Sequence, residues 1–213
     1  HMIPERFPLP KIDEVLSHLG GQMYYSVCDL AQGYLQIPVA EEDTEKLAFI
    51  THEGLFEFIR MPFGSTNAGP TFQRAMNTML SGLTWQICLP FVDDVVVWGT
   101  DFDDHLANLD QVFTRVKEFG MSLKSTKCKL FAAEVDYLGH IVTPLGVKPN
   151  QRLVSAVCDW PTPRNAGDLR SFLGTANFYR KFLKDYSAVA APLYELLQAG
   201  RVWRWQPVHQ RVF

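Results

Sequence analysis

The sequence predicts an α+β fold, in which an antiparallel sheet with packed helices is followed by a purely helical tail. Three observations support this class. Short runs rich in valine, isoleucine and aromatic residues alternate with amphipathic segments as far as about residue 142, prolines and glycines separate most of these runs, and only helical patterns follow Gly146. We therefore expect two subdomains, one mixed and one helical.

The expected elements follow in order, and each depends on a local pattern. Apolar residues at three- and four-residue spacing predict helices, β-branched and aromatic runs predict strands, and glycine or proline marks their ends. Pro38 puts its strand at an edge or bend, and Asn67 and Pro70 suit the start of the next helix. The mixed region is expected to contain a helix over 12–19, strands over 23–29 and 34–39, two strands within 47–61, a helix over 67–83, two strands within 85–99, a helix over 101–120, and short strands within 123–131 and 135–147. Helices are expected in the tail within 149–160, 166–183 and 187–200.

The charge of the chain is divided unevenly. The net charge is −3, but residues 1–110 hold 5 Lys/Arg and 16 Asp/Glu, whereas residues 111–213 hold 15 and 7. This asymmetry suggests an acidic half that could hold divalent cations and a basic half that could follow a phosphate backbone; the alternative is two solvated faces without a partner. No apolar run approaches the roughly 20 residues that a membrane span needs. The four cysteines form no C-x-x-C pair, which favours reduced thiols in an intracellular protein.

Two adjacent aspartates interrupt the strand-like run LPFVDDVVVW, residues 89–98. A buried, unpaired carboxylate is costly, so Asp93 and Asp94 either form a solvated hairpin tip or are neutralised by a cation. Asp29 ends an earlier strand and can lie beside them in an antiparallel sheet. Carboxylates gathered in this way suit Mg²⁺ or Mn²⁺, and two such ions can activate a 3′-hydroxyl and stabilise a leaving pyrophosphate. The metal site is the favoured interpretation.

Several motifs cover nearly the whole chain in this order: VCDLAQGYLQIPV, MPFGSTNAGPTFQRAMN, FVDD, LKSTKCKLF, YLGHIVTPLGV and DWPTPRNAGDLRSFLGTANFYRKFL. Together, and in family order, they resemble the reverse transcriptase of gypsy-type LTR retrotransposons and, more distantly, retroviral reverse transcriptases. The resemblance implies a palm from residues 3–36 and 68–142, partial fingers from residues 37–67, and a helical thumb from residues 143–213. It implies an RNA-directed DNA polymerase that uses two Mg²⁺ or Mn²⁺ ions.

The resemblance also implies a role for individual residues. Asp29 and Asp93 match the main metal-binding carboxylates, Asp94 stands beside them, and the Leu30 carbonyl would complete a metal shell. Lys127 matches a lysine near the pyrophosphate, a candidate general acid; the alternative is a solvated lysine at a strand edge. The matches around the nucleotide are Tyr34, which would exclude a 2′-hydroxyl, Phe63 and Gly64 against the nucleotide and template base, and Gln73 and Arg74, which face the template or nucleotide or form an ordinary helix surface.

Two further groups match regions that hold nucleic acid. Tyr137, Leu138, Gly139 and His140 match the hairpin that grips the primer terminus, with His140 expected to be structural. In the thumb, basic side chains are available to phosphates, which would make binding dependent on salt and independent of sequence. They are Arg164, Arg170, Arg180, Lys181 and Lys184.

The chain also departs from the family pattern. Phe91 stands where most relatives have tyrosine, Pro90 before it indicates an edge or bulge, and finger strands that hold the triphosphate are expected upstream of this sequence. We therefore also consider a catalytically weak or domesticated module that binds nucleic acid or a protein, and a phosphodiester hydrolase. Implied partners are an RNA template, a DNA primer or RNA–DNA hybrid and deoxynucleoside triphosphates, without a membrane. A homodimer or further polyprotein domains (RNase H, integrase) are compatible, in the cytoplasm or, if domesticated, the nucleus.

Overall fold

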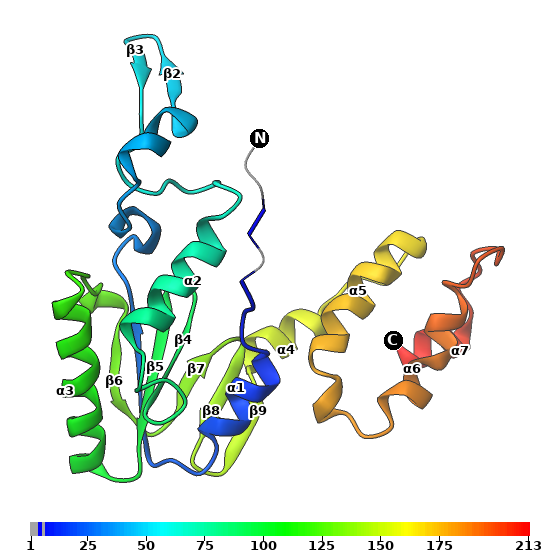
Figure 1. Ribbon diagram of the computed structural model, residues 1–213. Coiled ribbons are helices and arrows are strands. Elements are labelled where there is room, and N and C mark those ends of the chain that lie inside the picture. The colour runs from blue at the N-terminus through cyan, green and yellow to red at the C-terminus, as the bar shows by residue number, and fades with distance from the viewer. Residues whose placement is uncertain (1–3, 6) are drawn as a thin grey trace. The chain divides into compact units, whose positions relative to one another are not determined.

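A computed structural model describes residues 4, 5 and 7–213 (Figure 1). The chain divides into two compact units, one that ends at Val147 and one from Lys148 to Phe213. The expected palm limit at residue 3 lies outside the described residues. The α-helices and strands of the first unit are α1 (Ile12–Leu19), β1 (Tyr24–Asp29), β2 (Phe49–Thr51), β3 (Gly54–Phe56), α2 (Ala68–Met79), β4 (Cys88–Phe91), β5 (Asp94–Gly99), α3 (Phe102–Glu118), β6 (Lys129–Ala132), β7 (Val135–Tyr137), β8 (His140–Thr143) and β9 (Gly146–Pro149, which runs past the boundary).

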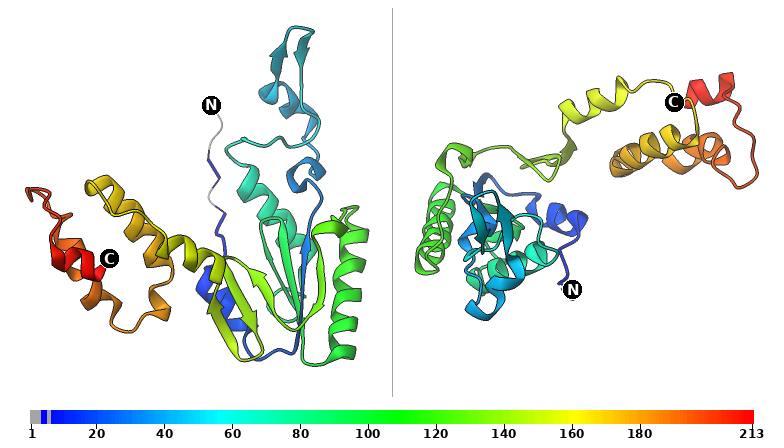
Figure 2. Two further views of the ribbon diagram at one scale, coloured as in Figure 1. Left: turned by 180° about the vertical axis from the view of Figure 1, so that it is seen from behind. Right: turned by 90° about the horizontal axis from the view of Figure 1, so that it is seen from above.

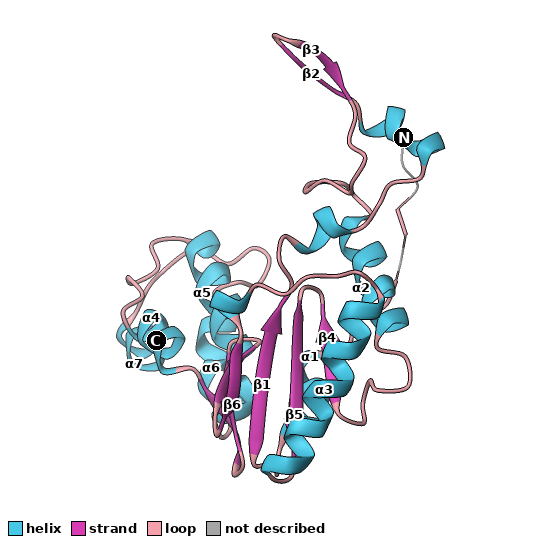
Figure 3. Cartoon of the chain, turned by 90° about the vertical axis from the view of Figure 1, so that its left-hand side faces the viewer, coloured by secondary structure: helices cyan, strands magenta, loops and turns pink. Residues whose placement is uncertain are grey.

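The central sheet has the strand order β4-β5-β1-β6, as Figure 3 shows. Its described pairs are antiparallel, and β1 and β5 match from Tyr24 opposite Gly99 to Asp29 opposite Asp94. β4 is an edge strand, where a proline such as Pro90 costs no ladder hydrogen bond, so the expected edge position is confirmed.

Two apolar layers cover the two faces of this sheet. On one face, residues of α2 and α3 pack with Cys28, Val95 and Val97. On the other face, α1 and the strands β7 and β8 pack against Tyr25 and Val96. α3 and α1 accordingly lie on opposite sides of the sheet in the view from above (Figure 2). The sheet is therefore buried along most of its length, and a ligand could reach its residues only at the ends of the strands.

The segment 34–39 is not the strand that the sequence predicts. It begins with a 3₁₀ helix, Gly33–Gln36, and Pro38 makes only an isolated bridge with Arg60. The reason is a pair of side-chain hydrogen bonds: the Gln36 amide donates to the carbonyls of Ala31 and Ser122, which closes the chain into a turn directly after β1. The predicted strand is wrong because these contacts outweigh its β propensity.

The second unit is helical, as predicted. It contains α4 (Gln151–Cys158), α5 (Ala166–Phe178), α6 (Tyr186–Glu195) and α7 (Pro207–Val212), of which α7 was not expected. Its core joins Leu169, Phe172 and Leu193 with aromatic residues near the C-terminus, including Trp205 and Phe213. α7 is held by this aromatic packing, which a short polar segment does not reveal in its sequence.

Among the described residues, no helix is both long and apolar enough to span a bilayer. The four cysteines are free: Cys28 and Cys88 are buried, Cys128 is half-buried and Cys158 is exposed.

Candidate active site

The two adjacent aspartates lie at the turn between β4 and β5. The two strands pair up to Asp94, so Val92 and Asp93 form the connection. Asp94 is also the register partner of Asp29, and the Leu30 N–H donates to the Asp93 carbonyl at 3.0 Å. The aspartates thus form a hairpin tip, and that tip lies beside Asp29.

A cavity of about 350 Å³ opens at this end of the sheet. It brings together residues from segments far apart in the chain. Each is either a site residue that the resemblance implies or lies in the same segment as one. The lining residues are Asp29, Leu30, Gln32, Gly33, Tyr34, Phe63, Asp93, Lys124 and Lys127. The lining combines carboxylates, aromatic rings and two lysines, so the cavity can receive a ligand with both a planar part and an anionic part.

The carboxylates at this end of the sheet influence one another. Burial, followed by the charges of Asp93 and Asp29, raises the pKa of the Asp94 carboxyl to about 6, although Lys127 opposes this. The Lys127 Nζ lies 2.9 Å from Asp29 Oδ2, and this hydrogen bond and charge raise the pKa of the lysine. Lys127 lies in a 3₁₀ turn, Ser125–Lys127, and its exposed side chain lines the cavity. It remains protonated and acts as the counter-ion of Asp29.

These residues fit a pair of divalent ions in their donor chemistry. Among the described residues, no three His, Cys, Asp or Glu side chains converge into a ready-made metal cage. Mg²⁺, however, is usually held by one or two carboxylates, with waters and substrate phosphates as the other ligands. Burial is the main cause of the raised pKa of Asp94, and the charges of Asp93 and Asp29 add to it; a bound cation would stabilise the ionised carboxylates against both effects. Asp29, Asp93, Asp94 and the Leu30 carbonyl would supply the protein oxygens.

We expect Asp94→Asn to stabilise the protein in the absence of divalent ions. The folded pKa of about 6 lies above the reference value of 3.8, so the contribution of Asp94 to stability is complete below pH 3.8 and is lost as the pH rises through 6. At about 1.4 kcal/mol per pKa unit, reduced for partial solvation, the gain at pH 8 is about 1–2 kcal/mol. Urea denaturation with chelator at pH 8 and near pH 4 measures it, with the exposed Asp110→Asn as control. Equal stabilisation at both pH values would contradict the electrostatic origin.

Tyr34 is one of two aromatic residues that line the cavity. Its ring lies 5.2 Å from that of Phe63 and 5.4 Å from that of Phe72, which restricts its movement. Burial and the charge of Asp93 raise the pKa of the Tyr34 hydroxyl, so the side chain is neutral. Phe63 is 64% exposed, and Gly64 has a φ of 86° with open space around it. Gly64 is therefore explained by its backbone conformation.

Gln73 is fully buried in α2, so an ordinary exposed helix surface is the wrong expectation for it. Its amide contacts the main chain of the β4–β5 hairpin, accepting from the Val92 N–H and donating to the Pro90 carbonyl. Arg74, one residue further, is exposed and forms an ion pair with Glu5. The two neighbours thus have different surroundings, and neither lines the cavity.

The expected primer-grip residues form the β7–β8 hairpin. Leu138 and Gly139 make its two-residue turn with φ values of 49° and 74°, and they are only partly buried. Tyr137 and His140 are almost fully buried, and burial together with the charge of Asp94 raises the pKa of Tyr137. Only the turn can therefore reach a ligand, while Tyr137 and His140 support it from the core.

The basic residues expected to contact phosphates all lie in the second unit, and all are exposed. Each is close to α5 or to the 3₁₀ turn that follows it. They are Arg164, Arg170, Arg180, Lys181 and Lys184.

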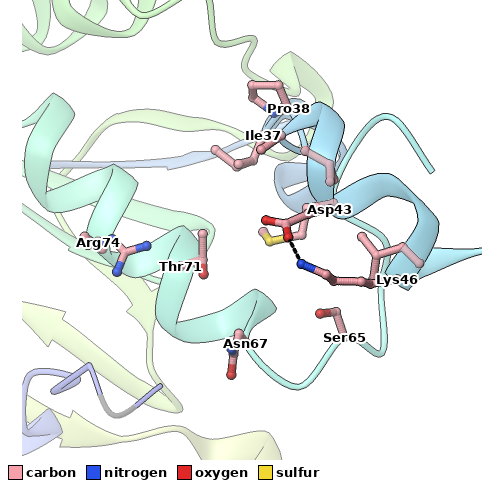
Figure 4. A pocket seen from close by; sticks show the side chains of 12 residues that line it. Ile37, Pro38, Asp43, Lys46, Ser65, Asn67, Thr71 and Arg74 are labelled. Atoms are coloured by element: carbon pink, nitrogen blue, oxygen red, sulfur yellow. Dashed lines mark hydrogen bonds and ion pairs between the residues drawn. The ribbon is translucent and has the colours of Figure 1, made fainter. Parts of the chain in front are cut away.

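A second pocket, of about 790 Å³, lies between the 3₁₀ segment Glu41–Leu47 and α2 (Figure 4). Its two cations are already neutralised: Lys46 pairs with Asp43, and Arg74 pairs with Glu5. Because both of these cations are already paired, the pocket is poorly suited to a phosphate. The cavity at Asp29 and Asp93 remains the candidate site.

Two residues that shape the site were not singled out from the sequence. The Gln36 amide accepts from the Ser122 N–H and donates to two carbonyls, which ties the segment after Asp29 to the loop that leads to Lys127. At Gly33, an added Cβ would lie 2.9 Å from the Phe72 ring and 3.4 Å from the Asp93 Cβ. This tight approach explains why a glycine stands in the AQG triplet. That glycine was the sequence signal that could have identified the position.

The antiparallel palm-like sheet with its aspartate tip agrees with a family comparison. The family described as "Reverse transcriptase (RNA-dependent DNA polymerase)" matches residues 2–142. The chain belongs to this reverse transcriptase family, and the expected resemblance is confirmed.

Individual relatives narrow the likeness to retrotransposons. The chain is 41% identical over 196 residues to the retrovirus-related Pol polyprotein from transposon 297 of Drosophila melanogaster, covering 92% of this chain and 18% of the relative. It is 38% identical to that from transposon gypsy of the same organism, covering 92% and 19%. The chain thus spans about a fifth of the length of these relatives.

Solved structures confirm the α+β fold class. A foamy viral protease–reverse transcriptase in complex with double-stranded DNA matches with a TM-score of 0.91 at 25% identity, covering 99% of this chain and 37% of that one. The foamy viral enzyme in complex with an RNA/DNA hybrid matches with a TM-score of 0.82 at 26% identity, covering 96% and 28%.

Proposed function

We propose that this chain is the core of an RNA-directed DNA polymerase, which extends a primer by nucleotidyl transfer with two divalent ions. The observation that carries the proposal is the shared cavity of Asp29, Asp93, Tyr34 and Lys127, with Asp94 as the register partner of Asp29. Polymerisation needs carboxylates for the ions, a surface for the nucleotide and a proton donor for the leaving group, and these residues can supply all three.

The family membership supports a division into palm (3–36 and 68–142), partial fingers (37–67) and thumb (143–213). We propose an RNA template with a DNA primer, or their hybrid, as partner, because related enzymes bind double-stranded DNA and RNA/DNA hybrids. The exposed basic residues of the second unit would contact phosphates and make binding dependent on salt.

In the proposed reaction, the protein side chains hold the ions, orient the reacting groups and donate a proton to the leaving group. The bound ions would lower the pKa of the primer 3′-hydroxyl and neutralise phosphate charge. Asp29 and Asp93 orient the reacting groups at the end of the sheet, Tyr34 fixes the sugar, and the protonated Lys127 donates a proton to the departing pyrophosphate.

We expect Tyr34→Ala to weaken the preference for deoxynucleotides. The ring is held by Phe63 and Phe72. In the proposed complex it would exclude a 2′-hydroxyl by steric contact, whereas alanine would open that space. The ratio of kcat/KM for a deoxynucleotide to that for the matching ribonucleotide should fall by at least about tenfold, the usual effect of a small steric difference. The ratio is its own control, since general damage affects both substrates. An unchanged ratio in an active variant would contradict the steric role.

Primer extension on an RNA template with Mg²⁺ or Mn²⁺ tests the proposal. We expect the wild-type chain to extend the primer and Asp93→Asn to bind the hybrid without extending it. Hybrid binding by the wild-type chain with no extension would instead favour a non-enzymatic module, and cleavage of the strand would favour a hydrolase. Equal extension by both proteins would contradict the metal mechanism.

A further inference from the structure

The tip of the β4–β5 hairpin has a backbone conformation that its sequence disfavours. Val92 has a φ of 53°, in the left-handed region. A β-branched residue rarely adopts this region unless surrounding contacts enforce it. Asp93 follows directly, so whatever enforces Val92 also determines where Asp93 stands.

The contacts that enforce it come from Gln73. The Gln73 Oε1 accepts from the Val92 N–H at 2.8 Å, and its Nε2 donates to the Pro90 carbonyl at 3.2 Å. Because β4 is an edge strand, no strand of the described part of the chain lies beside these two main-chain groups, which are on the side away from β5. The single buried amide of Gln73 therefore satisfies two main-chain groups that a neighbouring strand would otherwise bond.

Asp93 is also held from its other sides. Its carbonyl accepts from the Leu30 N–H at 3.0 Å, and its Cβ approaches Gly33, where the Phe72 ring leaves no free space. A hairpin tip fixed between β1 and α2 has little freedom to adjust. A loss of the contact to α2 would let the tip relax away from the disfavoured conformation and carry Asp93 with it.

We propose that Gln73 is a positioning residue, which holds the Pro90–Val92 main chain so that Asp93 points into the cavity. This assignment rests on the proposed function. It takes the place of the expected role, a direct contact with the template or nucleotide. Gln73 has no exposed surface, and both ends of its amide are used, because the Nε2 also donates to Asn77. A residue that acts at this distance affects catalysis through the geometry of the carboxylate.

The test compares Gln73→Leu with Asn108→Leu. Asn108 is also a buried helical amide bonded to a strand of the same sheet, but it donates to the Trp98 carbonyl, near the end of β5 remote from the aspartates. Both variants lose a buried hydrogen bond, so both are destabilised. Only Gln73→Leu is expected to weaken Mn²⁺ binding, by about 10- to 100-fold in an electron paramagnetic resonance titration, and to lower kcat with little change in KM for the nucleotide.

Two further measurements keep the result decisive. Hydrogen exchange at the Val92 amide should become fast in Gln73→Leu, and this readout needs no metal and no activity. In a Val92→Gly background, where the left-handed conformation costs little, Gln73→Leu should lose clearly less Mn²⁺ affinity. If wild-type protein binds no Mn²⁺, the proposed function fails while the exchange still tests the contact. A folded Gln73→Leu protein with wild-type exchange, or with Mn²⁺ affinity within twofold of wild type, would overturn the proposal, as would a raised KM at unchanged kcat.

Discussion

An Asp29→Asn variant is expected to lose primer extension by about three orders of magnitude, equivalent to about 4 kcal/mol of transition-state stabilisation. Asparagine keeps the shape of the side chain but removes the charge that a divalent ion needs, and it also takes the partner of Lys127 away. The measurement is single-turnover extension at saturating primer–template, with the exposed Asp110→Asn on α3 as a charge-matched control.

The carboxylates should also act as one unit. An Asp29→Asn, Asp93→Asn double variant is expected to lose little more than either single variant, because removing one member of a catalytic group already disables the others. Losses that multiply, or an Asp29→Asn variant within tenfold of wild type, would show that the two aspartates serve separate purposes.

A Gly99→Ala variant is expected to lose about 3 kcal/mol or more of folding free energy. The added Cβ would lie 2.6–2.7 Å from the Cα, Cβ and N atoms of His105, and backbone cannot move aside as a flexible side chain can. His105 is itself fixed, since its Nε2 lies 2.7 Å from Ser26 Oγ in a buried contact. Burial lowers the pKa of His105, which keeps the ring neutral in this position.

Urea denaturation compares this variant with Gly69→Ala. At Gly69, in the first turn of α2, an added Cβ would have only the Tyr34 hydroxyl within 4 Å, at 3.9 Å, so alanine should be neutral or stabilise by up to about 1 kcal/mol. Similar free energies of unfolding for the two variants would contradict the close packing of α3 on the sheet.

The sequence predicted the fold where local pattern and burial agree. α3 is an example: its apolar stripe is regular, and Asp101 caps it by accepting from the Asp104 N–H, as the acidic start suggested. The strands around the aspartates were equally visible, because valines and aromatics in a short run have few other uses. The predicted strand over 34–39 was wrong because the Gln36 amide bonds the carbonyl of Ser122, a residue far away in the sequence.

The candidate site was predictable in its carboxylates but not in their support. Asp29 and Asp93 are conspicuous as charges inside strand-like runs. Gln73 is less conspicuous, although it lies three and seven residues before the buried Met76 and Leu80 and so belongs to the apolar stripe of α2. Its polar partners are main-chain groups of the hairpin, which no sequence pattern identifies.

A crystal structure with Mn²⁺ and a non-hydrolysable deoxynucleotide tests the two-ion site most directly, because anomalous scattering locates the ions. We predict Mn²⁺ peaks coordinated by Asp29 and Asp93, with the Lys127 ammonium displaced from Asp29. A bound nucleotide with no Mn²⁺ peak at these aspartates, and with Lys127 still paired to Asp29, would contradict it.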